Sequence, residues 1–361
     1  MLYAVIIAGG AGKRLWPASR KGNPKFLLKL DGKASLLKST VSRAKELVPA
    51  NNIFIVANKE HVRPISKELP RFPRKNIIAE PVSRNTAPAI CVAAALIDKK
   101  DPNGLLFVMP ADHIIKGSTS VKEIFNLAAL VAHLKGAIVT IGIKPKAPLT
   151  GYGYIKQGKL YKRLMAKTKY DVFKVDRFTE KPSLPKAKQF LKTKKYLWNN
   201  GIFIATAKTF LEEFKRCKPS LYKITQKIQK GLLTKKQRSY IDRYYKKFQN
   251  ISMDYAIMEK TKKAYVIKSD IAWYDIGSWA SLDNYLCADS KGNIIKADHI
   301  GVDTNHSVVM GKKGHLIATC GLDGLVIIQT KDATIVCSKD RAEDVKSLVE
   351  LIEKKGLKRY L

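Results

Sequence analysis

The chain has 361 residues, of which 45% are hydrophobic and 27% charged, a balance typical of ordinary globular proteins. It carries 67 Lys and Arg against 30 Asp and Glu, and the net charge of +37 can attract nucleic acids, anionic lipids or small phosphorylated substrates. The five cysteines are scattered without a C-x-x-C pair, and no apolar run is long enough to cross a membrane. We therefore expect a cytoplasmic protein without a zinc site, a signal peptide or a membrane segment.

Short apolar runs alternate with helical patterns through the first half of the chain. Each run is bounded by Gly, Pro or Asn, and its length fits a strand. These patterns indicate a Rossmann-like α/β fold with a mixed, mainly parallel sheet that helices cover on both faces. Ligands bind such sheets beyond the carboxyl ends of the strands, so we look for chemistry in the loops that follow them. The predicted strands lie in 4–10, 52–60, 76–81, 104–115 and 137–145, and the predicted helices in 86–100 and 120–134.

The rest of the chain changes character twice. From about 150 to 285 it is richer in Lys and aromatic residues, and after that it becomes a series of short β-like runs with a helical pattern at the end. We therefore expect a large α/β domain in 1–287 and a small β domain in 288–361. Basic residues concentrate in 156–195, with fourteen against three acidic, and in 212–247, with twelve against three. Their near-helical spacing favours solvated helix faces.

The first predicted strand leads into a glycine-rich loop, in the segment VIIAGGAGKRLWPASR. The segment is neither a P-loop nor a dinucleotide-binding fingerprint, because it lacks the glycines and the Ser or Thr that these motifs require. Gly9, Gly10 and Gly12 still let backbone N–H groups converge on an anion, and Lys13 and Arg14 add positive charge beside them. The loop therefore indicates a phosphate site, with a tight structural turn as the alternative.

Two aspartates are candidates for a metal site. Asp112 follows an apolar run in PADH, where a carboxylate is commonly a helix cap or a turn residue. It becomes a Mg²⁺ ligand only with a second carboxylate and a substrate phosphate. Asp275, between aromatic residues in AWYDIGSW, supplies a second carboxylate, although the sequence alone does not bring the two together. His113 has no partner histidine nearby, and we interpret it as a packing residue.

Two further segments place polar groups at turns. In FTEKPS, Glu180 and Lys181 form either a surface ion pair of little energy or a site where Lys181 takes a phosphate and Glu180 a hydroxyl. In WNNG, Asn200 precedes Gly201 and either forms a plain turn or points at a polar ligand. Both segments therefore stay open between a structural role and a binding role.

Taken together, these segments resemble the sugar-nucleotidyltransferase family, and most closely its members that use mannose 1-phosphate. One such motif is weak, but nine in register are specific, and RLWPASR with RNTAPA is the part that indicates mannose. The similarity continues into the β-rich tail. It runs in order through AGGAGKRLWPASR, PKFLL, AEPVSRNTAPAI, PADH, TGYGYI, FTEKP, LWNNGIFIA, SMDYAIMEK and WYDIGSW.

The resemblance implies an enzyme that transfers GMP from GTP to α-D-mannose 1-phosphate and releases pyrophosphate. The sugar phosphate oxygen attacks the α-phosphorus directly and in line, with Mg²⁺ as the cofactor and no covalent enzyme intermediate. Residues 1–287 are then the nucleotidyltransferase domain, and 288–361 resemble a short left-handed β-helix with a terminal helix that packs subunits together. We accordingly expect a homodimer whose small-molecule partners are GTP and mannose 1-phosphate, with no membrane partner.

The resemblance also implies roles for individual residues. The nucleotide side comprises Ala8, Gly9, Gly10, Gly12, Lys13, Arg14, Lys25, Glu80, Asn85, Thr86 and Asp112. The sugar-phosphate side comprises Gly151, Glu180, Lys181, Asn200 and Asp275. The metal ligands are Asp112 and Asp275, and the catalytic residues are Arg14, Lys25, Asp112 and Lys181. For Asp254 in SMDYA, a place near the sugar and a structural role both stay open.

Several alternatives remain: another hexose 1-phosphate or nucleotide, or a non-catalytic regulatory or RNA-binding protein of the same fold. The family commonly has W-N-S-G where this chain has WNNG, and an acid where Lys156 stands, which keeps another sugar open. Against RNA binding, the chain has no recognition-module motif and no basic strip interleaved with aromatic residues, so we expect no nucleic-acid partner. The presence of both Asp112 and Asp275 favours catalysis over a scaffold role.

Overall fold

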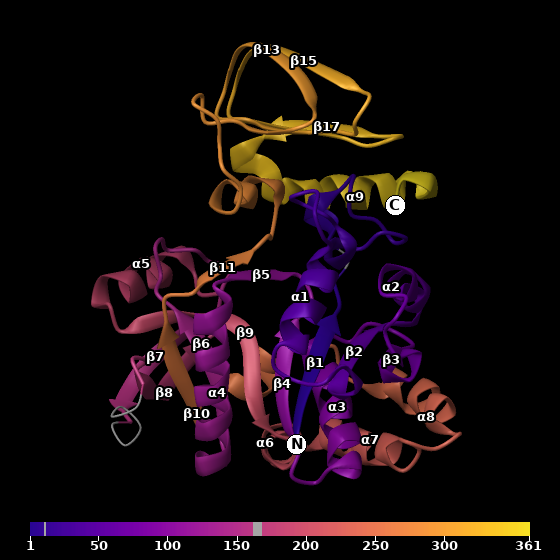
Figure 1. The fold of residues 1–361 in the computed structure, drawn as a ribbon, viewed down its shortest axis with the longest axis vertical. Helices are drawn as coiled ribbons and strands as arrows, with labels where there is room; N and C mark the ends of the chain where they lie inside the picture. Colours follow the sequence, from indigo (N-terminus) through magenta and orange to yellow (C-terminus); the bar gives the residue numbers. More distant parts are fainter. Residues whose placement is uncertain (11, 162–167) are drawn as a thin grey trace. The chain divides into compact units, whose positions relative to one another are not determined.

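The computed structural model describes residues 1–10, 12–161 and 168–361, which divide into two units (Figure 1). Unit 1 comprises residues 1–9, 40–111 and 115–273, and unit 2 comprises residues 10–39, 112–114 and 274–361. The chain therefore passes from one unit to the other several times. The domain boundary expected at residue 287 stays a prediction.

Unit 1 is built on a sheet of nine strands within the described residues, in the order β3-β2-β1-β4-β9-β6-β10-β8-β7. Strands β8 and β9 run against the others, so the sheet is mixed and mainly parallel, as the sequence predicts. The strands are β1 (Leu2–Ala8), β2 (Ile53–Asn58), β3 (Ile77–Glu80), β4 (Leu105–Pro110), β6 (Ile138–Ile143), β7 (Tyr154–Leu160), β8 (Val172–Thr179), β9 (Tyr196–Thr206) and β10 (Ala264–Ser269).

Helices cover this sheet, and one of them lies deep in the core. Helix α3 (Thr86–Lys100) is apolar on all sides and buried from Ala87 to Ile97, as expected of a helix enclosed by other elements. It packs against α6 (Ala207–Cys217) and α7 (Pro219–Gln229). The other helices of unit 1 are α2 (Val62–Glu68), α4 (Ser118–Lys135), α5 (Leu184–Thr193) and α8 (Gln237–Tyr244). Helix α1 (Leu36–Lys45) and the paired strands β5 (His113–Lys116) and β11 (Ala272–Asp275) contain residues of both units.

Unit 2 contains a stack of short parallel strands followed by a helix (Figure 1). Parallel pairing of β12 with β14, β14 with β16 and β13 with β15 gives the repeated rungs of a β-helix, and β17 closes the stack in the antiparallel direction. The small β-helix-like domain with a terminal helix is therefore confirmed. Its elements are β12 (Ile294–Lys296), β13 (Asp298–Asn305), β14 (Val308–Met310), β15 (Leu316–Asp323), β16 (Leu325–Gln329), β17 (Thr334–Ser338) and α9 (Val345–Lys354).

The core of unit 2 joins this stack to the segment that follows the glycine-rich loop. Trp16 and Leu28 pack in one apolar cluster with Trp279, Val308 and Val349. The indole N–H of Trp279 donates to the carbonyl oxygen of Trp16 at 2.9 Å. The segment that follows the loop therefore packs on the apolar core of unit 2.

Short 3-10 and π turns complete the fold, and two of the 3-10 turns position candidate site residues. They are η1 (Lys13–Leu15) and η2 (Lys25–Leu27). The remaining turns are η3 (Ala50–Asn52), η4 (Lys59–His61), η5 (Arg74–Asn76), η7 (Tyr245–Lys247), the π turn η8 (Asp254–Met258), η9 (Trp279–Asn284), η10 (Lys339–Asp344) and η11 (Lys358–Tyr360).

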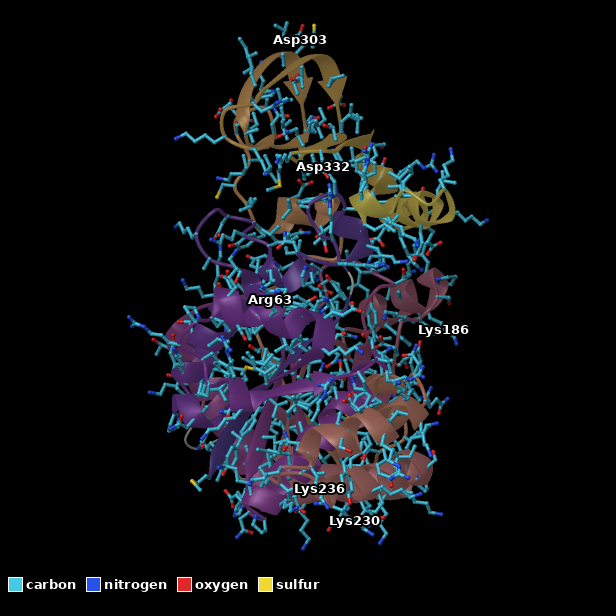
Figure 2. All side chains as sticks on the ribbon, turned by 90° about the vertical axis from the view of Figure 1, so that its right-hand side faces the viewer. Arg63, Lys186, Lys230, Lys236, Asp303 and Asp332 are labelled. Carbon is cyan, nitrogen blue, oxygen red and sulfur yellow. The ribbon has the colours of Figure 1, made fainter. Side chains whose placement is uncertain are left out.

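The lysine-rich stretches lie on the protein surface. Lys186 on α5 and Lys230 and Lys236 between α7 and α8 are exposed and point outward in Figure 2. The interpretation as a solvated helix face is therefore confirmed for Lys186, whereas Lys230 and Lys236 are exposed residues of the segment between two helices. Among the described residues, no helix has both the length and the apolar character needed to cross a membrane.

Candidate active site

The glycine-rich loop leaves the carboxyl end of β1 and enters η1. Ala8 is fully buried as the last residue of the strand, and Gly10 and Gly12 both have positive φ, at 91° and 57°. The two loop cations are engaged with acids of unit 2. Lys13 Nζ lies 3.7 Å from a Glu353 carboxylate oxygen, and Arg14 Nε lies 2.8 Å from one of Glu343. Such exposed pairs stabilise little, so both cations can exchange these partners for a phosphate.

Gly12 is fixed by its neighbours as well as by its backbone. A Cβ atom added at position 12 would lie 2.6 Å from Lys25 Cβ and 2.6 Å from Ser19 Oγ. The first of these is the root of a side chain, which cannot rotate out of the way. Glycine at position 12 therefore allows the loop to pack directly against Lys25.

Lys25 joins two aspartates that lie far from it in the sequence. Its ammonium is 2.6 Å from Asp112 Oδ2 and 3.0 Å from Asp275 Oδ1, although Asp275 is 250 residues away along the chain. Asp112 comes two residues after β4, and Asp275 ends β11. The structure therefore brings together the two carboxylates that the sequence proposed as a pair, with Lys25 between them.

His113 also lies beside this cluster. Its Nε2 is 3.8 Å from Asp275 Oδ1 and 4.0 Å from Asp112 Oδ1, and its side chain is mostly buried. Sequence reasoning interpreted His113 as a packing residue, because no other histidine is near it in the chain. The interpretation missed the contact because Asp275, one of the two carboxylates, comes from a distant strand.

The charges of this cluster stabilise one another. Burial alone would raise the pKa of Asp275, but Lys25, His113 and Arg14 outweigh burial and hold that pKa at about 2. Burial would likewise lower the pKa of Lys25, but the carboxylates of Asp112 and Asp275 raise it above its ordinary value. At neutral pH the cluster therefore contains an ionised Asp275 carboxylate and a charged ammonium.

This donor set fits a divalent metal of the magnesium type. Mg²⁺ in proteins is commonly held by one or two carboxylates together with substrate phosphate oxygens. Asp112 and Asp275 already converge on a single cation, the Lys25 ammonium. Among the described residues no group of three or more His, Cys, Asp or Glu side chains is arranged to hold a metal alone. Any metal here would therefore need oxygen ligands beyond these two side chains.

The segment expected to read the base is held by structural hydrogen bonds. Glu80, the last residue of β3, is buried and accepts a hydrogen bond from the Tyr245 hydroxyl. Asn85 caps α3 by accepting from the Thr86 backbone N–H at 2.9 Å, and Thr86 Oγ1 accepts from Met253 N–H at 2.8 Å. Base recognition by these residues stays a prediction. The sequence did not reveal Tyr245, because nothing local marks it as the partner of Glu80.

The buried carboxyl group of Glu80 predicts a pH dependence of stability. Burial raises the pKa of Glu80 to about 7, against the smaller opposing effect of the Tyr245 hydrogen bond. The pKa of Glu80 is higher in the folded than in the unfolded protein, so the neutral carboxyl favours the folded state. This contribution to the free energy of unfolding is complete below about pH 4.5 and is lost as the pH rises towards 7. Between these pH values we expect the free energy of unfolding of wild type to fall by on the order of 3 kcal/mol relative to that of Glu80→Gln, measured by urea unfolding. Parallel pH profiles for the two proteins would contradict this.

A second cluster of candidate residues lies within unit 1. Lys181 Nζ is 3.1 Å from Glu180 Oε1, and Lys181 is half exposed, whereas the Glu180 side chain is buried. Lys181 has a φ of 45°, a left-handed conformation that side chains rarely adopt, and its N–H donates to Tyr152 O at 3.2 Å. Gly151 is exposed with open space around it. The ion pair that the sequence left as one of two alternatives is therefore present on a strained turn, with the Glu180 side chain buried, and the binding role stays a prediction.

Asn200 lies in the interior of strand β9. It is fully buried, and its Oδ1 accepts from the Ile202 N–H at 3.0 Å. Its Nδ2 has no hydrogen-bond partner among the described residues. A buried donor without a partner is costly, so this amide is a group that a ligand oxygen would satisfy.

Comparisons with known proteins show the family of the chain. The model of the nucleotidyl transferase family matches residues 3–291. The chain belongs to this family. A second family model, for the MannoseP isomerase/GMP-like beta-helix domain, matches residues 297–352.

Relatives of this nucleotidyl transferase cover nearly its whole length. "Mannose-1-phosphate guanylyltransferase" of Escherichia coli is 38% identical over 99% of this chain and 77% of its own. "Xanthan biosynthesis protein XanB" of Xanthomonas campestris is 38% identical over 98% of this chain and 73% of its own. A crystal structure described as mannose-1-phosphate geranyltransferase from Thermus thermophilus superposes with a TM-score of 0.86 at 30% identity, covering 98% of this chain and 99% of that one.

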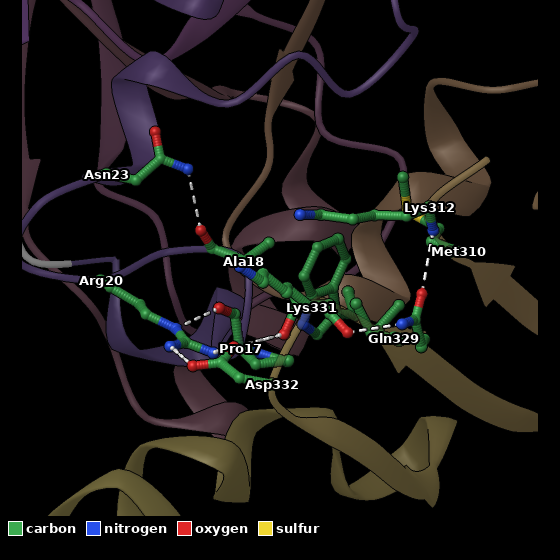
Figure 3. Close-up of a pocket in the computed structure, with 13 residues that line it drawn as sticks. Pro17, Ala18, Arg20, Asn23, Met310, Lys312, Gln329, Lys331 and Asp332 are labelled. Atoms are coloured by element: carbon green, nitrogen blue, oxygen red, sulfur yellow. Dashed lines mark hydrogen bonds and ion pairs between the residues drawn. The ribbon is translucent and has the colours of Figure 1, made fainter. Parts of the chain in front are cut away.

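A separate pocket of about 360 Å³ lies within unit 2 of this nucleotidyl transferase (Figure 3). On one side Arg20 makes two hydrogen bonds of 2.7 Å to the Asp332 carboxylate, and Asn23 Nδ2 donates to Ala18 O. On the other side Lys312 N–H donates to Gln329 Oε1 at 3.0 Å. The pocket wall therefore ties the segment that leads to Lys25 onto the β-helix. The lining comprises Pro17, Ala18, Arg20, Asn23, Trp279, Met310, Gly311, Lys312, Ile328, Gln329, Thr330, Lys331 and Asp332.

Proposed function

We propose that this chain transfers GMP from GTP to α-D-mannose 1-phosphate, giving GDP-mannose and pyrophosphate. Membership of the nucleotidyl transferase family and the relatives named mannose-1-phosphate guanylyltransferase support this reaction. The observation that carries the proposal is the cluster of unit 2, in which Asp112 and Asp275 hold Lys25 just beyond strand β4. A scaffold protein has no need of two carboxylates that converge on one buried ammonium.

We assign the metal to the carboxylates of Asp112 and Asp275, and we propose that it is Mg²⁺. When bound, the ion neutralises charge on the reacting phosphates and orients them. Asp112 and Asp275 would then be paired with the metal ion, and the Lys25 ammonium would be free to bind a phosphate oxygen. The proposed roles of Lys13, Arg14 and the amides of Gly9, Gly10 and Gly12 are to hold the triphosphate, whose β and γ groups leave as pyrophosphate.

We assign the sugar phosphate to the cluster of unit 1. Lys181 would bind the phosphate, and Glu180 would accept hydrogen bonds from sugar hydroxyl groups. Asn200 would donate its unpartnered Nδ2 to a ligand oxygen. A phosphate oxygen of the sugar 1-phosphate then attacks the α-phosphorus of GTP in line, and the bond to pyrophosphate breaks. The protein's contribution is to position the reactants and to neutralise charge, so no side-chain nucleophile is required.

The expected homodimer is part of this proposal. Ile300, Val302 and Leu316, on the paired strands β13 and β15, have exposed fractions of 60%, 60% and 64%. An exposed apolar group of this kind is a surface that a second copy would cover. The cytoplasmic location and the absence of a nucleic-acid partner stay predictions.

The reaction is tested by pyrophosphate release with purified protein, GTP, Mg²⁺ and a panel of hexose 1-phosphates. We expect mannose 1-phosphate to give the highest kcat/KM, and GTP to exceed ATP and UTP as the nucleotide. Equal rates with mannose and glucose 1-phosphate would remove the mannose assignment and leave a nucleotidyltransferase of broader preference. Absence of pyrophosphate release with every pair would overturn the enzymatic proposal, and salt-sensitive RNA binding that GTP abolishes would favour the RNA-binding alternative.

A further inference from the structure

A hydrogen-bond chain in unit 1 runs from the central sheet to Asp254. Thr140 on β6 is fully buried, and its hydroxyl donates to Asn199 Oδ1 at 3.0 Å. Asn199 on β9 donates from Nδ2 to Asp254 Oδ1 at 3.0 Å. The same Asn199 Oδ1 also accepts from the Gly201 N–H at 3.2 Å. With both lone-pair positions of Oδ1 occupied, the Asn199 amide has a fixed orientation and presents its Nδ2 to Asp254.

Asp254 faces the Glu180–Lys181 turn. Burial and the neighbouring Glu180 carboxyl together raise the pKa of Asp254 to about 7, although Lys181 and Ser252 oppose the rise. Burial also raises the pKa of Glu180, with Lys181 opposing and Glu259 adding to the rise. These two carboxyl groups therefore share a partly buried site beside one ammonium.

Different contacts hold the carboxyl groups of Glu180 and Asp254 in place. The Glu180 backbone N–H donates to Glu259 Oε1 at 2.9 Å, and its side chain packs so closely on Gly153 that a Cβ there would lie 2.7 Å from Oε2. Asp254 is the first residue of a short π turn, where Ser252 also hydrogen-bonds its carboxyl group, and the side-chain contact from Asn199 supplies the tie to the sheet. Without that tie, Asp254 could turn away from Glu180.

We propose that Asn199 is a positioning residue that holds Asp254 as the second member, with Glu180, of a carboxyl pair binding adjacent hydroxyl groups of the hexose. Two carboxyl groups in one site accept hydrogen bonds from two neighbouring hydroxyls, and such contacts reject a sugar that lacks one of them. This inference rests on the proposed function, because it concerns the sugar of the same reaction. It resolves the role of Asp254 in favour of a place near the sugar.

The test measures KM for mannose 1-phosphate and for GTP in wild type, Asn199→Ala, Asp254→Ala and the double variant. We expect Asn199→Ala to raise KM for mannose 1-phosphate about tenfold, the usual effect of losing a hydrogen bond to a charged group. We expect KM for GTP to stay within about twofold, since Asn199 is assigned to the sugar alone. In the Asp254→Ala background, removing Asn199 should change KM for mannose 1-phosphate little, because Asn199 acts through that carboxyl.

Deoxy sugars give a readout that a merely structural role would not move. Wild type should discriminate against at least one of 2-, 3- and 4-deoxymannose 1-phosphate, and Asn199→Ala should lose most of that discrimination. Thr140→Val, which removes the hydroxyl behind Asn199 at constant size, should show the same loss in weaker form. The matched control is Asn76→Ala, because Asn76 is also a buried amide of unit 1 whose Nδ2 donates to the backbone carbonyls of Asn51 and Ile53.

The outcomes separate this inference from the proposed function. If wild type transfers GMP to mannose 1-phosphate but Asn199→Ala raises both KM values equally, the positioning role is wrong and the reaction stands. Additive effects in the double variant, or unchanged deoxy-sugar discrimination, would overturn it in the same way. If wild type shows no transfer to any hexose 1-phosphate, the proposed function itself fails.

Discussion

Asp112→Ala and Asp275→Ala are each expected to lower kcat by about 10²-fold or more, the usual loss when developing charge is deprived of its counter-ion. The reason lies in the geometry: both carboxylates meet one cation, Lys25, at 2.6 and 3.0 Å. Removing either carboxylate leaves only one of the two side-chain ligands that we assign to the metal. It also leaves the buried Lys25 ammonium with a single carboxylate partner, so its side chain loses its fixed position.

The measurement is kcat as a function of Mg²⁺ and Mn²⁺ concentration, with GTP and mannose 1-phosphate saturating. The concentration of metal needed for half-maximal rate should rise in both variants, which distinguishes loss of a ligand from loss of folded protein. Asp340→Ala is the control, because Asp340 is an exposed acid in unit 2. A near-normal kcat with an unchanged metal requirement would remove the metal assignment.

Much of the fold could be predicted because the signal is local. The apolar runs that end at Ala8, Asn58 and Ile143 are strands, and the apolar stretch in 86–100 is the buried helix α3. Hydrophobic period and bounding Gly, Pro or Asn suffice for such elements. The order of strands in the sheet was not accessible in this way. β9 inserts between β4 and β6 in the antiparallel direction, and only tertiary packing decides that position.

In the candidate site, too, local features could be predicted from the sequence and contacts between distant segments could not. Asp112 and Asp275 could be proposed as a pair because each stands in an unusual local setting, beyond a buried strand or between aromatic residues. Their contact with Lys25 and the approach of His113 depend on distant segments, which no local pattern encodes. Asn199 was passed over for the same reason. In WNNG the sequence singles out Asn200, which precedes the glycine. The hydrogen bonds to Thr140 and Asp254 are made by Asn199 instead.

Gly12→Ala is expected to lower kcat by about 10²-fold through Lys25, although position 12 carries no reacting group. The added Cβ would lie 2.6 Å from Lys25 Cβ, well inside van der Waals contact, and the φ of 57° adds an intrinsic cost of about 1–2 kcal/mol for a residue other than glycine. Because Lys25 is held between two carboxylates and cannot rotate at its root, relief of the clash moves its backbone. A displacement of about 1 Å at a reacting group is enough for a loss of this size.

Gly22→Ala is the matched control, since a Cβ at position 22 meets nothing within 4 Å and its φ lies outside the left-handed region. Both variants should remain folded by circular dichroism, and Gly12→Ala alone should lose kcat. Adding Ser19→Ala to Gly12→Ala removes the second clash, with Ser19 Oγ, and leaves the clash with Lys25 in place. Recovery of kcat in that double variant would mean that Ser19, and not Lys25, transmits the effect, whereas a persistent loss ties the glycine of the loop to the position of the lysine.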